Sequence, residues 1–97
     1  MFTVTRKKAS PLCRVEFVFP GNPGKTVLVA GSFNDWTPEG SVMTYDASAE
    51  AYFYAVDLQP GYYEYKFVVD GRWILDEENP SFSANDFGTL NSVITIE

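Results

Sequence analysis

The stretch that most constrains the fold is residues 60–76, PGYYEYKFVVDGRWILD. Asp70 and Gly71 stand between two runs of aromatic and β-branched residues, and an Asp-Gly pair in that setting is typical of a two-residue type I′ hairpin turn. Upstream, Pro60 and Gly61 suit a type II turn, because Pro presets the first central φ and Gly accepts the positive φ of the second. We therefore expect a strand over residues 62–69 and a returning strand after residue 71.

A two-residue turn also fixes which residues of a hairpin lie opposite each other. Strand alternation predicts a core face of Tyr63, Tyr65, Phe67 and Val69, and an outer face of Glu64, Lys66 and Val68. The predicted cross-strand pairs are Val69 with Arg72, Val68 with Trp73, Phe67 with Ile74, and Lys66 with Leu75. Trp73 then shares the outer face with Lys66, which indicates a binding surface.

The rest of the chain reads as short strands and turns, without a convincing amphipathic helix. Strands are predicted over residues 12–19, 25–32, 42–45, 52–58 and 92–97, and residues 77–91 are predicted as a long polar loop. Trp36 falls where the second of these strands meets a loop, and Asn34 and Asp35 before it are interpreted as turn formers. The pattern predicts an all-β, antiparallel β-sandwich, with a small edge-closed barrel as the alternative.

Length and composition limit the functions and partners that a protein with such a fold can have. A chain of 97 residues makes one domain, which we assign to residues 12–97, preceded by an arm or edge strand at residues 1–11. The net charge of -6 argues against nucleic acid as a partner, and the basic run Arg6, Lys7 and Lys8 is too short to change that. A lone Cys13 excludes an internal disulfide and suggests a buried thiol. With no apolar run near the roughly 18 residues of a membrane span, we expect a soluble, cytoplasmic protein without membrane contact.

Catalysis and metal binding have little support in the sequence. The chain has no His, and it lacks the nucleophile-elbow, phosphate-loop and zinc-ligand spacings. The acidic run at residues 76–78 lacks the alternating oxygen ligands of a calcium loop and is interpreted as solvated charge. We therefore predict a non-enzyme with no metal and no cofactor.

Three motifs, in order, carry a family resemblance: VLVAGSFNDW at residues 27–36, LQPGYYEYKFVVDGRW at 58–73 and NDFGTLNSV at 85–93. Together they resemble the family 48 carbohydrate-binding module, the glycogen-binding domain of AMP-activated protein kinase β subunits. The motifs are also similar to the early-set domain of isoamylases and glycogen branching enzymes. The resemblance covers residues 12–97 and implies an immunoglobulin-like sandwich that binds α-1,4-glucan on one sheet face, with a glycogen-metabolising enzyme or a kinase as a protein partner.

The resemblance also implies roles for individual residues. Trp36 matches the Trp that ends the G-S-F-N-x-W motif, and Trp73 matches the Trp that follows the V-D-G turn. In glycogen-binding members these two indoles stack on glucose rings. Lys66 matches the Lys of Y-K-F, which hydrogen-bonds glucose hydroxyls.

Three more roles fall in the last motif. Thr89 and Asn91 match the Thr and Asn of G-T-x-N, with Asn91 implied as the stronger sugar contact. Phe87 stands where kinase members carry a Leu that pushes into the ring of a cyclic or helical glucan. The change from Leu to Phe bears on which glucan chain shape or branching the protein prefers.

The residue types suit a sugar ligand on physical grounds as well. Pyranose rings present C–H patches that pack on flat aromatic faces, while Lys and Asn supply hydrogen bonds to neighbouring hydroxyls. Each residue has a structural alternative: Trp73 as core, Lys66 as a solvated strand residue, Asn91 as a turn residue, and Phe82 and Phe87 as a satellite core under the loop. The alternative function is a structural or protein-interaction domain that keeps the fold without binding sugar.

Overall fold

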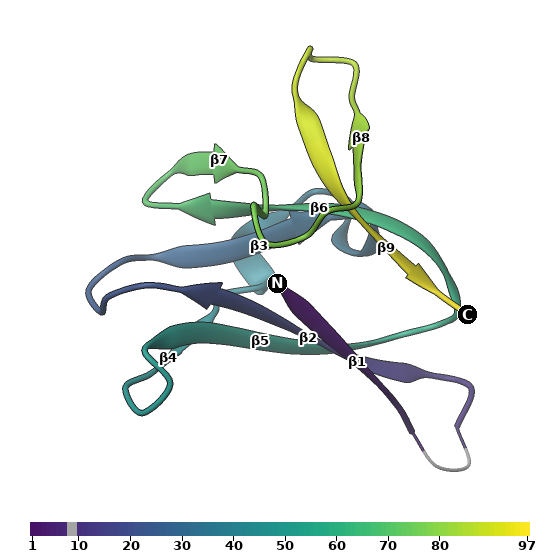
Figure 1. The fold of residues 1–97 in the computed structure, drawn as a ribbon, viewed down its shortest axis with the longest axis horizontal. Helices are drawn as coiled ribbons and strands as arrows, with labels where there is room; N and C mark the ends of the chain where they lie inside the picture. The colour runs from purple at the N-terminus through teal and green to yellow at the C-terminus, as the bar shows by residue number, and fades with distance from the viewer. Residues whose placement is uncertain (8–9) are drawn as a thin grey trace.

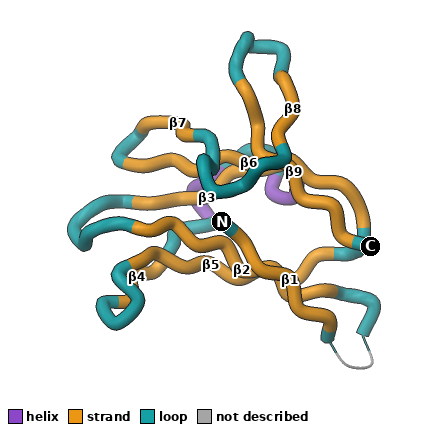
Figure 2. The backbone as a smooth tube through the Cα atoms, in the orientation of Figure 1, coloured by secondary structure: helices purple, strands orange, loops and turns teal. Residues whose placement is uncertain are grey.

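The computed structural model describes residues 1–7 and 10–97. In them the chain forms nine β-strands and two short 3-10 helices (Figures 1 and 2). The strands are β1 Phe2–Arg6, β2 Cys13–Pro20, β3 Val27–Gly31, β4 Thr44–Asp46, β5 Ala51–Leu58, β6 Gly61–Val69, β7 Arg72–Ile74, β8 Phe82–Ala84 and β9 Leu90–Ile96. The 3-10 helices are η1 Ser32–Asn34 and η2 Pro38–Gly40, both between β3 and β4.

The strands divide into two sheets whose pairings are all antiparallel. The first sheet has the order β1-β2-β5-β4, and the second has the order β3-β6-β9-β8, with β7 also paired to β6. Figure 1 shows these strands as two layers. The structure therefore confirms the predicted antiparallel β-sandwich and not the closed barrel.

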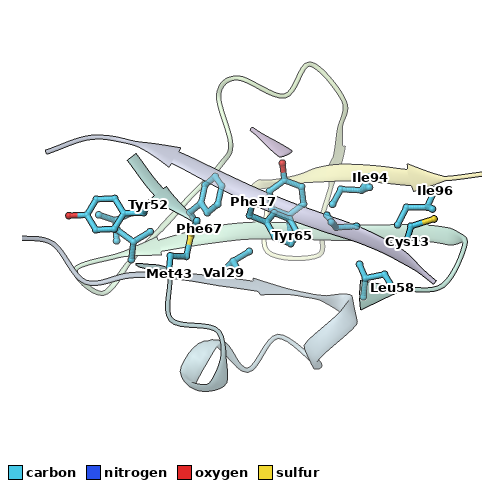
Figure 3. Close-up of a cluster of buried hydrophobic side chains, with 13 residues drawn as sticks. Cys13, Phe17, Val29, Met43, Tyr52, Leu58, Tyr65, Phe67, Ile94 and Ile96 are labelled. Atoms are coloured by element: carbon cyan, nitrogen blue, oxygen red, sulfur yellow. The ribbon is translucent and has the colours of Figure 1, made fainter. Parts of the chain in front are cut away.

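The hydrophobic core fills the space between the sheets (Figure 3). Its centre is made of aromatic rings, with Phe17 of β2 packed edge-on against Tyr65 of β6 at 4.9 Å between ring centroids. Cys13 and Val15 of β2 are also at most 1% exposed, as the alternation along that strand predicts, so the thiol is buried. Burying one such apolar side chain stabilises the fold by roughly 1.5–3 kcal/mol.

The hairpin of β6 and β7 has the predicted register. Phe67 pairs with Ile74, Val68 with Trp73, and Val69 with Arg72. The turn residues Asp70 and Gly71 have φ values of 50° and 83°, and a type I′ turn requires both to be positive. The predicted pair of Lys66 with Leu75 lies beyond the end of β7.

Two details of this region differ from the prediction. Gly61 has a φ of 157°, far from the roughly +80° that a type II turn requires. It already pairs with Ile96 as the first residue of β6, so its conformation belongs to the strand. Val68, on the outer face, is only 5% exposed because it lies between its cross-strand neighbours Leu28 and Trp73.

The predicted loop over residues 77–91 is wrong in its second half, where β8 and the start of β9 form a hairpin. Phe82 pairs with Ser92, and Ala84 pairs with Leu90. A three-residue strand with a central Ser has weak local preference for extended structure, and pairing with a neighbouring strand overrides it. In Figures 1 and 2 this hairpin projects from the rest of the sandwich.

The interpretation of residues 76–78 as solvated charge is wrong for Asp76, which is 4% exposed. Its carboxylate accepts a hydrogen bond from the Tyr65 hydroxyl at 2.5 Å, and its backbone N–H donates to the Ser92 hydroxyl at 3.0 Å. The Asn79 amide also donates to Tyr65, at 3.2 Å. Burial and the bond to Asp76 raise the pKa of the Tyr65 hydroxyl. This polar cluster fastens the connection between β7 and β8 to the second sheet, because Tyr65 belongs to β6 and Ser92 to β9.

The first residues of the chain belong to the sandwich. β1 pairs with β2 and forms one edge of the first sheet, while residues 8 and 9 of the predicted arm lie outside the described residues. Of the predicted basic run, Lys7 forms an ion pair with Asp57 at 2.8 Å, and Lys8 is not described. No helix in the described part of the chain is long and apolar enough to cross a membrane.

Candidate functional site

A pocket of about 880 Å³ opens on the outer face of the second sheet. Three outward residues of β6, namely Tyr62, Glu64 and Lys66, form its floor. The β6–β7 and β8–β9 hairpins supply two of its sides, and the loop around η1 supplies another. All six residues implied by the family resemblance line it, although they are spread over more than half the chain. The lining residues are Ser32, Trp36, Tyr62, Glu64, Lys66, Trp73, Ala84, Asn85, Asp86, Phe87, Thr89 and Asn91.

Trp36 reaches the pocket from the loop that follows η1. Asp35 and Trp36 have φ values of 55° and 58°, a conformation that costs a bulky residue roughly 1–3 kcal/mol. The Trp36 N–H donates to the Gly31 carbonyl at 2.9 Å. The Asn34 side chain accepts from the Gly31 N–H at 2.9 Å and donates to the Val29 carbonyl at 3.2 Å, as expected of a turn former. These bonds hold the strained loop with the half-buried indole at the pocket.

The same loop is fastened to β6 through a close backbone approach at Gly31. A Cβ atom at this position would lie 2.6 Å from the Glu64 carbonyl oxygen and 2.4 Å from the ring of Phe33, so only glycine fits. The Glu64 N–H donates to the Ser32 hydroxyl at 3.1 Å. Phe33 in turn stacks on Phe17 of the core at 5.4 Å, which anchors the loop from beneath.

Lys66 connects the floor of the pocket to the β8–β9 hairpin. Its half-buried side chain lies on the outer face of β6, and its Nζ donates to the Thr89 hydroxyl at 3.2 Å. Thr89 is exposed at the end of the hairpin loop. The two residues therefore form one polar edge with N–H and O–H groups available to a ligand.

The side chain of Asn85 makes four hydrogen bonds at the loop of the β8–β9 hairpin, and the Asn85 backbone N–H also donates to the Thr89 carbonyl at 3.0 Å. Its Oδ1 accepts the backbone N–H groups of Phe87 at 2.9 Å and Thr89 at 3.1 Å. Its Nδ2 donates to the Thr89 hydroxyl at 2.7 Å and to Asn91 Oδ1 at 3.0 Å. Asn85 thus fixes the positions of three residues implied by the family resemblance.

Asn91 is more enclosed than an open sugar contact would be, at 7% exposed. Its Nδ2 donates to Glu64 Oε1 at 3.1 Å, while its Oδ1 accepts from Asn85. The other Glu64 oxygen accepts from the Tyr62 hydroxyl at 3.2 Å. Because each amide group of Asn91 has further bonding capacity, the side chain is oriented by the protein and still has room for a hydroxyl partner at the pocket wall.

Three of the four aromatic residues that line the pocket, Tyr62, Trp73 and Phe87, are open to solvent, and Trp36 is half-buried. Trp73 is 48% exposed and Phe87 is 90% exposed, so both structural alternatives, core and satellite core, are wrong for them. Phe82 is 57% exposed, so it is not satellite core either, and it lies outside the lining residues. Large exposed aromatic rings grouped on one surface are typical of a binding site.

The charges of the pocket argue against an anionic ligand. Among the described residues that line it, Lys66 is the only cation, and it shares the surface with Glu64 and Asp86. An anionic polymer would be repelled by these carboxylates and by the net charge of -6. No group of three or more His, Cys, Asp or Glu within the described residues is placed to hold a metal ion. Flat rings beside neutral and charged hydrogen-bonding groups suit a polyhydroxylated ligand.

Several lining residues were not identified from the sequence as candidates. Tyr62 and Glu64 share the outward parity of Lys66, so the alternation along β6 is a signal that would have found them. Asn85 and Asp86 stand in the segment predicted as a loop and open the third motif, although no role is implied for them there. Ser32 follows β3 directly, with no sequence signal for its bond to β6.

Comparison with known proteins places this arrangement in a family. Residues 13–97 match the family model described as the glycogen recognition site of AMP-activated protein kinase. Over 74 residues, 76% of this chain, it is 35% identical to the 5′-AMP-activated protein kinase subunit beta-1 of Sus scrofa, of which it covers 57%. Over the same length it is 36% identical to subunit beta-1 of Bos taurus and 34% identical to subunit beta-2 of Homo sapiens, covering 26% of each.

The chain therefore belongs to the family of the AMP-activated protein kinase glycogen recognition site, and this confirms the predicted resemblance. It spans about a quarter of the length of most of these relatives. The family is one of glycogen recognition, so carbohydrate binding is the function class that the comparison supports.

Proposed function

We propose that this member of the glycogen recognition family binds chains of α-1,4-linked glucose, as in glycogen, starch and maltooligosaccharides, without catalysing a reaction on them. The observation that carries the proposal is the convergence of six residues, from four separate segments, on one open pocket. Exposed rings, hydrogen-bonding groups and a single cation beside two carboxylates at this pocket all suit a neutral sugar.

In this proposal the two tryptophans supply the stacking surfaces. Trp73 stands on the short strand β7 with 48% of its surface open to solvent, and Trp36 is half-buried in a strained loop that holds it in place. The C–H faces of a glucose ring pack on an indole with the hydrophobic gain of an aromatic contact. Because both indoles project from fixed backbone positions, little backbone conformational entropy is lost when sugar binds.

Polar residues between the rings fix the orientation of the chain. Lys66 and Thr89 already bond each other at 3.2 Å, and both have capacity for glucose hydroxyls. Asn91 contributes the hydrogen-bond donor and acceptor capacity that its oriented amide does not use within the protein. Phe87, at the tip of the β8–β9 hairpin, contacts the sugar from the side and affects which chain shapes fit.

The protein partners follow from the relatives, which are named as kinase subunits. In the proposal the domain attaches a kinase, or a glycogen-metabolising enzyme, to glucan. Its single Cys13 is buried as a free thiol, which is compatible with the reducing cytoplasm.

A fluorescence titration tests the proposal, because both tryptophans of the chain line the pocket. We expect β-cyclodextrin and maltoheptaose to change the tryptophan emission saturably in the unmodified chain. Trp73→Ala and Lys66→Ala should lose this response while circular dichroism shows a folded sandwich. A folded, unmodified chain that does not respond would contradict the proposal and favour a structural or protein-interaction domain.

A further inference from the structure

Tyr62 is an additional aromatic residue of the pocket. It stands near the start of β6, at the end of the strand away from Trp73. Trp73 is opposite Val68, six residues along β6 from Tyr62. A strand rises about 3.3 Å per residue, so the two positions are roughly 20 Å apart along the strand. Both side chains are on the outer face, and both line the same pocket.

The environment of Tyr62 differs from that of an isolated surface aromatic. The side chain is 57% exposed, and its hydroxyl donates to Glu64 Oε2 at 3.2 Å. Glu64 Oε1 accepts from Asn91, which is bonded in turn to Asn85. Tyr62 is therefore joined by hydrogen bonds to the polar side of the site, and its ring is held beside it.

We infer that Tyr62 forms an additional glucose-binding position, so that the pocket takes an extended glucan and distinguishes chains by length. A short oligosaccharide occupies the part of the pocket near Trp73 and Lys66. A longer chain continues along the outer face of β6 and places a further glucose ring on Tyr62. This inference rests on the proposed function, because it extends the same site.

Calorimetric titration with maltotriose and maltoheptaose tests the inference. We expect Tyr62→Ala to weaken maltoheptaose binding about five- to tenfold, the effect of losing one ring contact, and to change maltotriose binding less than about twofold. Tyr62→Phe keeps the ring and should retain most of the affinity for maltoheptaose. Thermal unfolding of each variant checks that the exposed substitution leaves the fold intact.

Phe82 offers a matched control, because it is also 57% exposed but lies outside the pocket. Phe82→Ala should bind both sugars as the unmodified chain does. Equal maltoheptaose affinity in Tyr62→Ala and the unmodified chain would overturn the inference and leave the proposed function intact. A loss of the same size for both sugars would also overturn it, because Tyr62 would then act on the central site. Failure of the unmodified chain to bind either sugar would overturn the proposed function as well.

Discussion

The two hairpins beside the pocket are built in different ways. The β6–β7 hairpin, which carries Trp73, turns through the backbone conformation of Asp70 and Gly71. Asp70 further fastens it to the neighbouring strand, since its N–H donates to the Thr26 carbonyl and its carboxylate accepts from the Thr26 N–H, both at 2.9 Å. In the β8–β9 hairpin, the side chain of Asn85 adds four hydrogen bonds to the backbone bonds of the loop.

This difference separates two ways of positioning a ligand contact. The first turn presents Trp73 at a position set by the register of β6 and β7. The second presents Phe87 and Thr89 on a loop where the Asn85 side chain bonds both, so that a single substitution alters them together. We expect the first hairpin to govern whether sugar binds and the second to govern how well and in which shape.

The largest expected effect comes from Gly71→Val. The φ of 83° at Gly71 is strained for a β-branched residue, so the turn should lose roughly 1–3 kcal/mol and the position of Trp73 should shift. We expect maltoheptaose affinity to fall by at least about tenfold, because the main stacking surface moves. Chemical denaturation and calorimetric titration measure the two effects.

Gly24→Val is the control for this substitution. Gly24 has a φ of 95° and, like Gly71, has open space where a Cβ atom would lie, but it stands in the connection between β2 and β3, away from the pocket. It should destabilise the chain to a similar extent and leave sugar affinity unchanged at temperatures where the chain is folded. If both variants lose sugar binding equally, general destabilisation accounts for the loss.

A smaller effect is expected at Asn85. Asn85→Ala removes four hydrogen bonds in the loop and should weaken maltoheptaose binding about five- to tenfold. Asn85→Asp keeps the acceptor for the Phe87 and Thr89 N–H groups but loses both donations by Nδ2. It should therefore retain the loop and still lose affinity, because Thr89 and Asn91 lose their bonds from Nδ2 and Asn91 keeps only its bond to Glu64.

Asp46 provides a comparison on the other sheet. Its carboxylate accepts the Ser48 N–H at 2.9 Å and the Ser48 hydroxyl at 2.6 Å in the turn after β4, and these bonds lower its pKa. Asp46→Ala should loosen that turn without affecting sugar affinity.

An Asn85→Asp variant that binds as tightly as the unmodified chain would show that Nδ2 has no role in positioning the site.

The smallest effect is expected at Phe87, which is 90% exposed. Phe87→Leu should leave the unfolding temperature almost unchanged and alter affinity only about two- to threefold, because a smaller apolar group still contacts the sugar. The informative quantity is the ratio of affinities for β-cyclodextrin and maltoheptaose, which should change because the tip residue determines which chain shape fits. An unchanged ratio would contradict a role for Phe87 in shape preference.

The same contrast explains how far the sequence predicts this molecule. The Asp70-Gly71 pair requires one turn type, so the register, the outer face and the position of Trp73 follow from local chemistry. The six implied site residues were found through motifs, and the structure brings all of them to one pocket. Local chemistry also accounts for the alternation of β2 and the burial of Cys13.

Features that depend on distant contacts were not predictable in this way. The short strand β8 forms because β9 pairs with it, and the buried Asp76 is bonded by Tyr65 and Ser92, which belong to other strands. Asn85 opens the third motif and makes local turn bonds to Phe87 and Thr89, but its bond to Asn91 depends on the pairing of β8 with β9. At Pro60-Gly61 the local pattern predicts a type II turn, but the pairing of Gly61 with Ile96 decides the backbone conformation instead.

The most direct test of the proposed site is an NMR titration of the two tryptophan indole N–H groups with maltoheptaose. Spectra of Trp73→Phe assign the two signals. We expect both signals to shift saturably and with one dissociation constant, because Trp36 and Trp73 line the same pocket. If neither indole signal moves at millimolar maltoheptaose while the spectrum shows a folded protein, the pocket on the second sheet is not a glucan site.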